Sequence, residues 1–387
     1  MSVSRRAFVQ TLGVGGAGLI STTRFRPEQG GLLESILEAA EARPILLHNN
    51  ENPVGPSSAA IDAMRGILGT TAAPAGRYPT NKAALLKAIA AKSGVEVGNV
   101  IVACGSTELL RIAVQVFTSK ASPLVGGAPT YEECAGYAEL IGTPVKAINL
   151  DGQLRLDLAA MAAASKGAGM VYLNNPNNPT ATIQPATAIE GFVNDVLKAS
   201  PKTTILIDEA YHDYVTDPSH KSQIPLAMQN PRVIVARTFS KAYGMAGLRL
   251  GYVIAHPDTI AAMHKWEATA AMSVLSIGAG IASINDPTHI DVEVKRNTAA
   301  RQFTVDWFKR AGFTTTDSQA NFLFVDIKRP AASFRDACRA QGVLVGRDFP
   351  PYAKTHTRIS IGTIEEMRKA TEVFGKVLSS SNTAAAA

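Results

Sequence analysis

Short runs of apolar residues recur through the middle of the chain and are separated by stretches long enough to form helices. Strands that are buried on both faces are apolar throughout, and helices between them allow parallel pairing. Between the first two runs, apolar residues from Leu109 to Phe117 recur at helical spacing. The pattern predicts an α/β fold with a mostly parallel central sheet covered by helices, with strands at Ile101–Cys104, Pro123–Gly126, Met170–Leu173, Thr204–Ile207, Val233–Ala236 and Leu250–Ile254.

The pattern changes near residue 285. A charged stretch predicts a long helix over Val292–Phe308, and shorter apolar runs alternate with one more helical segment beyond it. We expect a smaller α+β domain in this part of the chain. Its predicted elements are strands at Phe322–Ile327, Val343–Val345 and Arg358–Ile361 and a helix at Ala331–Gln341.

The first 25 residues resemble a targeting segment. Arg5 and Arg6 precede a weakly apolar, glycine-rich run from Thr11 to Ile20. Paired arginines before such a run are typical of a twin-arginine export signal, which predicts a periplasmic protein. The alternative is an N-terminal extension of a cytoplasmic protein. The run is shorter than the roughly 20 apolar residues of a spanning helix, so we expect no membrane span. A helix over Leu32–Ala40 is expected to open the mature chain.

Charge, cysteines and histidines argue against several functions. The formal charge is +6, but four arginines and no acidic residue lie in the first 26 positions, so no clustered basic face for nucleic acid is indicated. The three cysteines form no CxxC pair and the seven histidines show no HxxxH or HExxH spacing, so we expect no metal site. Gly13, Gly15 and Gly18 spell GxGxxG, but no strand precedes them and no acidic residue follows before Glu28, so a dinucleotide site is not indicated.

Polar motifs follow five of the predicted strands. In open α/β sheets, ligands bind beyond the carboxyl ends of the strands, where such motifs meet. Their convergence predicts a binding site at that edge. The motifs are Gly105–Glu108, Ala128–Tyr131, Asn174–Thr180, Asp208–Tyr211 and Arg237–Lys241.

Several of these motifs, together with further ones, carry a family resemblance. They are Asn50–Pro53, Arg77–Pro79, the Gly105 loop, Pro129–Tyr131, Asn175–Thr180, Asp208–Tyr211, Thr238–Tyr252 and Arg358–Gly362. With them the chain resembles the class I/II, fold-type I, pyridoxal-phosphate-dependent aminotransferases, and it is most similar to the histidinol-phosphate aminotransferase branch. The resemblance spans residues 45–363, and SKAYGMAGLRLGY, which begins at Ser240, is its most specific part.

The resemblance implies four catalytic residues around pyridoxal 5′-phosphate. Lys241 matches the lysine that holds the cofactor as a Schiff base and then shuttles a proton. Asp208 matches the carboxylate that stabilises the protonated ring nitrogen. Asn178 and Tyr211 match the residues that donate hydrogen bonds to the ring O3′.

The phosphate and ring face have their own predicted partners. Gly105, Ser106 and Thr107 open an apparent helix, whose N-terminal amides suit a dianion. Arg249 lies eight residues after Lys241, at the family spacing for the phosphate-binding arginine. The remaining cofactor contacts implied by the resemblance are the hydroxyls of Thr238 and Ser240, the stacking ring of Tyr131, and Tyr78, which is expected to reach the site of a neighbouring subunit in a homodimer.

Substrate contacts follow from the same resemblance. Arg358 matches the arginine that binds the acid group of the substrate, and Arg347 is a candidate for a second cation. Asn52 is a candidate for the entrance, although its loop could be purely structural. Ala181 departs from the family, which usually has glycine there. If that position needs a positive φ, alanine costs about 1 kcal/mol.

The expected activity is transfer of an amino group between an amino acid, or an amino-alcohol phosphate, and a 2-oxo acid by a ping-pong mechanism. A decarboxylase or lyase with the same cofactor, and a non-catalytic binding protein, are the alternatives. The expected organisation is an export signal (1–25), an N-terminal arm with part of the small domain (26–70), a large cofactor-binding domain (71–285), the small C-terminal domain (286–378) and a disordered tail (379–387).

Overall fold

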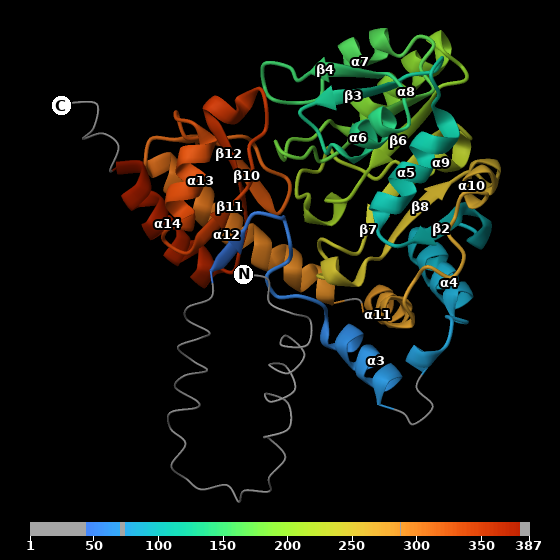
Figure 1. The fold of residues 1–387 in the computed structure, drawn as a ribbon, viewed down its shortest axis with the longest axis horizontal. Coiled ribbons are helices and arrows are strands. Elements are labelled where there is room, and N and C mark those ends of the chain that lie inside the picture. Colours follow the sequence, from blue (N-terminus) through green and yellow to red (C-terminus); the bar gives the residue numbers. More distant parts are fainter. Residues whose placement is uncertain (1–43, 70–73, 287, 380–387) are drawn as a thin grey trace, which may run out of the picture. The chain divides into compact units, whose positions relative to one another are not determined.

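The computed structural model describes residues 44–69, 74–286 and 288–379, and its centre is a seven-stranded sheet (Figure 1). Of the strands in this sheet, β8 alone runs antiparallel to its neighbours, and the others are parallel to one another. The strand order is β2 (Val100–Ala103), β8 (Gly251–Ala255), β7 (Val233–Thr238), β6 (Thr204–Asp208), β5 (Met170–Asn174), β3 (Leu124–Ala128) and β4 (Val145–Asn149).

Alternate residues of these strands enter two separate apolar cores, because successive side chains of a strand point to opposite faces. In β5, Val171 and Leu173 join one core, whereas Met170 and Tyr172 join the other. The first core is covered by α4 (Lys82–Ser93), α7 (Leu158–Ala164), α8 (Ala186–Ala199), α9 (Ile224–Gln229) and α11 (Val274–Asn285). The second is covered by α5 (Ser106–Phe117), α6 (Glu133–Leu140) and α10 (Pro257–His264).

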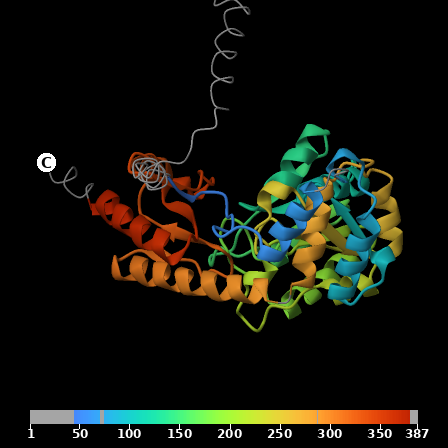
Figure 2. The ribbon, with the colours of Figure 1, turned by 90° about the horizontal axis from the view of Figure 1, so that it is seen from below.

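A smaller α+β region has its own core. Its antiparallel sheet has the order β12 (His356–Ser360), β10 (Phe322–Asp326) and β9 (Thr314–Thr315). The long helix α12 lies alongside α14, the red helix in Figure 2. The helices are α12 (His289–Arg310), α13 (Ala331–Arg339) and α14 (Ile364–Ser379).

Both ends of the described chain contribute to the smaller region. β1 (Ile45–Leu47) pairs in parallel with β11 (Val343–Val345). The chain then reaches the large sheet, where α3 (Ser58–Leu68) packs on α11. The Ser57 side chain caps α3 by accepting a hydrogen bond from the Ala60 N–H. Short 3₁₀ turns occur at Pro74–Gly76, Val97–Asn99, His212–Tyr214, Ala246–Leu248 and Tyr352–Lys354.

The fold confirms the predicted α/β class with a smaller domain built from both chain ends. All six predicted strands of the large sheet are present, and the sequence missed β4. β4 is an edge strand whose side chains are mostly exposed, so it lacks the apolar run that marks the buried strands. The expected export signal, the helix over Leu32–Ala40 and all of the C-terminal tail except Ser379 lie outside the described residues. Among the residues that are described, no helix is both long and apolar enough to cross a membrane.

Candidate active site

A cavity of about 460 Å³ opens beyond the carboxyl ends of the parallel strands and is also walled by the smaller region. This is the edge at which ligands bind in open α/β sheets. The structure brings together in its lining most of the residues singled out in the sequence. They are Ser106, Thr107, Tyr131, Asn178, Asp208, Tyr211, Thr238, Ser240, Lys241, Arg249, Arg347 and Arg358.

One end of the cavity is suited to a phosphate. Gly105 has φ +81° and precedes α5, and a Cβ built on it would lie 2.5 Å from the Arg249 guanidinium. A Cβ on Gly251 would lie 2.1 Å from the backbone nitrogen of Ser106. Only glycine therefore allows the helix start and the arginine to approach this closely. Free N–H groups at the start of a helix and a nearby guanidinium form an anion site.

Arg249 is held in place by its neighbours at this end. Its guanidinium donates to the Ser240 hydroxyl at 3.4 Å and to the Ala246 carbonyl at 3.0 Å. The Ser240 N–H donates to the Thr238 hydroxyl oxygen at 3.1 Å. Arg249, Ser240 and Thr238 thus present a cation and two hydroxyls to the same part of the cavity.

Lys241 lies in the cavity, where the protonated form of its amine is disfavoured. Its Nζ donates to the Asn49 carbonyl at 3.1 Å and lies 5.7 Å from the centroid of the Tyr211 ring. Burial, followed by the positive charges of Arg358 and Arg249, lowers its pKa from 10.5 to about 8. A lysine with this pKa has a substantial neutral fraction near neutral pH, and the neutral amine is the nucleophile needed for bonding to an aldehyde.

Asp208 ends β6 and is 2% exposed. Its two carboxylate oxygens accept hydrogen bonds from the Tyr172 hydroxyl at 2.8 Å and from the Ala210 N–H at 3.1 Å. Burial raises the pKa of Asp208 to about 6, against the effects of these two hydrogen bonds and of Lys241. The group is therefore a buried, largely ionised carboxylate at neutral pH, suited to a cationic ring N–H.

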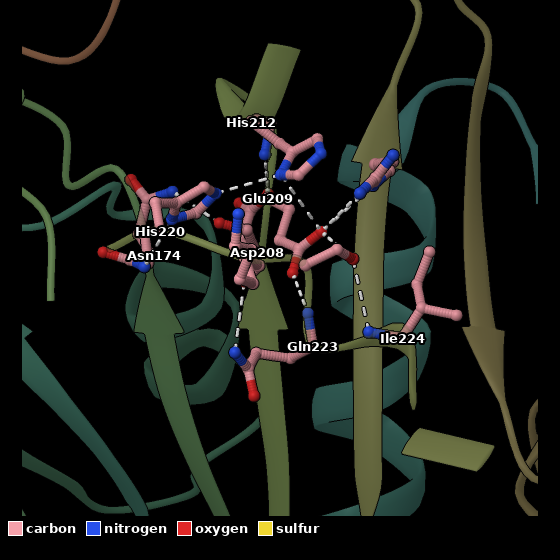
Figure 3. A network of polar contacts seen from close by, with 12 residues as sticks. Asn174, Asp208, Glu209, His212, His220, Gln223 and Ile224 are labelled. Atoms are coloured by element: carbon pink, nitrogen blue, oxygen red, sulfur yellow. Dashed lines mark hydrogen bonds and ion pairs between the residues drawn. The ribbon is translucent and has the colours of Figure 1, made fainter. Parts of the chain in front are cut away.

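A buried polar network lies next to Asp208 (Figure 3). Glu209 accepts two hydrogen bonds from Arg237, at 2.8 and 3.0 Å. Burial alone would raise the pKa of Glu209, but the charges of Arg237 and His212 lower it. His212 Nδ1 lies 2.9 Å from Nε2 of His220. Glu209 is therefore an ionised carboxylate paired with Arg237, and its charge adds to burial in raising the pKa of Asp208.

Asn178 and Tyr211 are oriented as donors by other residues. Asn178 Oδ1 accepts a hydrogen bond from Arg358 at 2.8 Å, which leaves the amide NH₂ free for the cavity. The Tyr211 hydroxyl accepts from Asn50 Nδ2 at 3.2 Å, so its own proton can be donated. Burial raises the pKa of Tyr211 to about 12, against the positive charge of Arg358, and keeps that proton in place.

Arg358 and Arg347 enter the cavity from the smaller region and differ in exposure and in hydrogen-bond partners. Arg358 is 7% exposed, donates to the His48 carbonyl at 2.5 Å, and has no hydrogen-bond partner for its Nε. Arg347 is half exposed and donates to both carboxylate oxygens of Glu132, at 2.6 and 3.1 Å. Both guanidiniums lie on Phe349, at 5.0 and 4.5 Å from the ring centroid. Arg358 is thus paired with neutral oxygens, whereas Arg347 is paired with a carboxylate.

Three predicted residues do not line the cavity. The Asn52 amide donates to the Ala242 carbonyl at 3.1 Å and accepts from the Val54 N–H, so it ties its loop to the lysine segment, and its place at the entrance stays a prediction. Gly105 contributes backbone next to Arg249. Tyr78 is 82% exposed and lies away from the cavity of its own chain.

Two residues that hold predicted site residues in place were not predicted from the sequence. Asn50, with φ +56°, orients Tyr211 and is itself bound through its side chain and its N–H to Ser360. Tyr172 binds Asp208, as described above. Asn50 could have been found, because it stands in the motif from which Asn52 was chosen. Tyr172 gave no signal, because it lies inside an apolar strand.

Ala181 adopts a left-handed backbone, a conformation that glycine takes without strain. Its φ is +59°, and its methyl group is fully buried against Tyr211, Tyr214 and Phe322. Its N–H and carbonyl are bonded to Asn177 and Gln319. The surrounding contacts therefore hold the strained backbone without the usual residue.

The donor set fits pyridoxal phosphate. The chain supplies a phosphate cradle that a Cβ would fill, a buried carboxylate for a protonated ring nitrogen, two oriented donors for a phenolic oxygen and an amine of lowered pKa for an aldehyde. Together with the fold, this site defines a pyridoxal-phosphate-dependent enzyme of fold type I.

Comparisons with known proteins give the family. The model of "Aminotransferase class I and II" matches residues 42–374. A histidinol-phosphate aminotransferase of Symbiobacterium thermophilum is 32% identical over 336 residues, 86% of this chain and 90% of the relative. An aromatic amino acid aminotransferase of Mycobacterium marinum is 31% identical over 353 residues, 89% and 94% of the two chains. The crystal structure of histidinol-phosphate aminotransferase from Sinorhizobium meliloti, in complex with pyridoxal-5′-phosphate, matches with a TM-score of 0.81 and 26% identity over 93% and 99% of the two chains.

The chain therefore belongs to the class I and II aminotransferases, and it is a transaminase that uses pyridoxal phosphate, an amino donor and a 2-oxo acid. When bound, the cofactor supplies an electron sink that stabilises negative charge at the substrate Cα. The protein residues bind and orient the reactants. With the cofactor in this cavity, Asp208 would hold a proton at the ring nitrogen, and the Lys241 amine would move a proton at Cα.

Proposed function

We propose that the amino donor of this transaminase carries one acid group, bound by Arg358, and an aromatic or heteroaromatic side chain. The observation that carries the proposal is the buried guanidinium of Arg358, which has only neutral oxygens as hydrogen-bond partners and one unpaired N–H. A buried cation without a carboxylate partner favours an incoming anion. The named activities of the two relatives support a donor of this chemistry, because both act on compounds with an aromatic ring and an acid group.

The second cation, Arg347, already has a carboxylate partner in Glu132. A donor with a second acid group would have to displace Glu132 from Arg347. This favours a donor with a single acid group, carboxylate or phosphate, over a dicarboxylic one.

The experiment is a panel of single half-reactions. Purified holoenzyme is mixed with histidinol phosphate, aromatic amino acids, aliphatic amino acids and acidic amino acids, and conversion of the cofactor to its amine form is followed by absorbance. Conversion is expected to be fastest with the first two groups. Faster conversion with aspartate or glutamate would contradict the proposed donor. Release of CO₂ or ammonia without conversion to the amine form would instead indicate a decarboxylase or lyase.

We also propose that the enzyme is a homodimer in which Tyr78 completes the neighbouring site. The support is the exposure of Tyr78 and its position outside the cavity of its own chain. Light scattering is expected to give twice the chain mass. Tyr78→Phe is expected to weaken cofactor affinity without changing that mass.

The proposed location is the periplasm, supported by the paired arginines in the first 25 residues. Replacing Arg5 and Arg6 together with lysine is expected to retain the protein in the cytoplasm, as measured by cell fractionation. Recovery of the unchanged protein in the cytoplasm would favour a cytoplasmic enzyme.

A further inference from the structure

Tyr172 is the residue that the family resemblance does not explain. It lies in β5, and its register partner in the neighbouring strand β6 is Leu206, two residues before Asp208. Residues two positions apart in a strand point to the same face of the sheet, so Tyr172 and Asp208 share one face of adjacent strands. The Tyr172 hydroxyl donates to Asp208 Oδ2 at 2.8 Å, and both residues are 2% exposed.

The hydrogen bond acts on the basicity of Asp208. It lowers the pKa of Asp208 against the larger effect of burial. Burial and the nearby carboxylate also raise the pKa of Tyr172, so the phenol keeps its proton and remains a donor. Hydrogen bonds to a charged partner contribute more than those between neutral groups, and the contrast grows away from water.

The other groups that face Asp208 do not replace this donor. Glu209 is paired with Arg237, and Lys241 lowers the pKa of Asp208 through its charge alone. Cys134 of α6 lies on the same face of the sheet, and burial raises its pKa well above the usual value. The rings of Tyr131 and Tyr211 also face the carboxylate and carry no charge at neutral pH, because burial raises the pKa of both hydroxyls. Among the described residues, Tyr172 is thus the only one whose side chain donates a hydrogen bond to the Asp208 carboxylate.

We propose that Tyr172 is a positioning residue that keeps Asp208 a weak base, so that the proton shared with the cofactor stays on the ring nitrogen. Two arrangements compete: a protonated nitrogen beside a carboxylate, and a neutral nitrogen beside a carboxylic acid. The phenol stabilises only the first, because its hydrogen bond is stronger to an anionic oxygen. Removal of the hydroxyl shifts the proton toward Asp208, and the neutral ring is a weaker electron sink.

The alternative hypothesis is that Tyr172 only packs in the core and has no effect on the cofactor. The chain offers a matched control for that hypothesis. The Tyr214 hydroxyl donates to Glu293 Oε1 at 2.9 Å, both residues are buried, and neither lines the cavity. Tyr172→Phe and Tyr214→Phe each remove one buried hydroxyl from a carboxylate and leave the ring in place.

The test compares the two variants as holoenzymes loaded with pyridoxal phosphate labelled with ¹⁵N in the ring. The ¹⁵N chemical shift of the resting enzyme is measured against pH without substrate. In Tyr172→Phe, the ring ¹⁵N shift is expected to move toward the value of a neutral ring over the whole pH range in which the wild-type ring is protonated, because the proton moves to Asp208 within the pair and is not released to solvent. The ratio of protonated to neutral ring nitrogen is expected to fall about tenfold or more, the size of one hydrogen bond to a charged group. Tyr214→Phe is expected to give the wild-type shifts. An unchanged ¹⁵N shift in Tyr172→Phe would overturn the proposal, whatever happens to activity.

Kinetics provide a second readout. Tyr172→Phe is expected to lower kcat of the half-reaction about 10- to 100-fold, the size of one hydrogen bond to a charged group, with little change in KM. In an Asp208→Asn background, the same change is expected to have less than about a threefold effect, because the carboxylate through which it acts is gone. Equal effects in both backgrounds would show that Tyr172 acts by another route.

A further variant covers the case in which Tyr172→Phe does not fold. Site-specific replacement of Tyr172 by 3-fluorotyrosine keeps the hydroxyl and makes it a stronger donor. The ratio of protonated to neutral ring nitrogen is then expected to rise, and a ¹⁵N shift toward the value of the neutral ring would contradict the proposal. Because the resting-enzyme titrations need no substrate, failure of the donor proposal above would leave this test intact.

Discussion

The floor and the rim of the cavity use charge in opposite ways. The floor consists of Asn178, Asp208, Tyr211, Lys241 and Arg358, in which all but Lys241 are less than 9% exposed. The rim is the ion pair of Arg347 with Glu132, whose side chains are 52% and 59% exposed. Burial shifts the pKa values of Asp208, Lys241 and Arg358, whereas water screens the rim pair.

The difference predicts which residues matter most. A charge in the floor has lost its hydration, so each hydrogen bond to it is worth more than the same bond at the surface. A charge in the rim keeps its hydration and can exchange partners at little cost. Floor substitutions should therefore have large effects on catalysis, and rim substitutions should change selectivity by small factors.

The largest effect is expected for Lys241→Ala in the floor. It removes both the amine that binds the cofactor and the proton carrier, so the half-reaction rate should fall by about 10⁴-fold or more. The rate is measured by single-turnover absorbance. Lys221→Ala, which removes an exposed lysine, serves as the control and should keep the wild-type rate. A borohydride-reducible cofactor adduct that persists in Lys241→Ala would contradict the assignment.

Arg358→Gln is expected to have the next largest effect. Loss of one partner of a buried charge pair costs about 2–5 kcal/mol, so kcat/KM for an acid-bearing donor should fall about 30- to 4,000-fold. Arg347→Gln is the rim counterpart and should lower kcat/KM of the same donor less than about tenfold. Steady-state kinetics with one donor measures both, and equal losses would abolish the contrast between floor and rim.

Cofactor capture by the apoenzyme should depend on pH in a way set by Lys241. Because its pKa is lowered to about 8, the fraction of neutral amine rises about tenfold per pH unit below pH 8 and levels off above it. The rate of capture, followed by absorbance from pH 6.5 to 9, should have this shape. A rate that continues to rise toward pH 10 would show that the amine has an ordinary lysine pKa.

The sequence predicted the floor better than its supporting contacts. Lys241 and Asp208 stand in short motifs at the ends of strands, so the parallel sheet brings them together once its pattern is recognised. Arg358 lies within β12 of the smaller sheet and was identified from the family resemblance of its motif. The choice between Asn50 and Asn52 could not be made in this way, because Ser360, 310 residues away, fixes the left-handed backbone of Asn50. Contacts of that range leave no local pattern.

The order of the strands in the large sheet could not be predicted from the sequence either. Apolar runs predict buried strands, but β2 and β8 are neighbours although about 150 residues separate them, and β8 is antiparallel. The edge strand β4 was missed for the opposite reason, because its exposed residues resemble a loop. The rim pair could not be predicted either, since Glu132 and Arg347 come from different regions of the chain.

Glu132→Gln tests the rim directly. It releases Arg347, so the ratio of kcat/KM for a dicarboxylic acceptor to that for a monocarboxylic one should rise about 2- to 5-fold, as expected for an exposed ion pair worth up to about 1 kcal/mol. Glu133→Gln is the matched control, because Glu133 pairs with Arg111 instead. The ratio should stay unchanged in the control, and the gain in Glu132→Gln should shrink at high salt.

The smallest effect is expected behind the floor, where Ala181 carries backbone strain and no charge. Ala181→Gly relieves roughly 1–2 kcal/mol of left-handed strain but loses about 0.8 kcal/mol of methyl burial and up to about 1 kcal/mol through the greater freedom of the unfolded chain. The free energy of unfolding in urea should therefore change by less than about 1 kcal/mol, with activity retained. Ala181→Val should lose more than about 2 kcal/mol, because a β-branched residue fits neither the positive φ nor the packed contacts with Tyr211 and Phe322. If valine were tolerated as well as glycine, the loop that follows Asn178 could change its backbone conformation without loss of stability. The position of the Asn178 side chain in the floor would then not depend on the backbone conformation of Ala181.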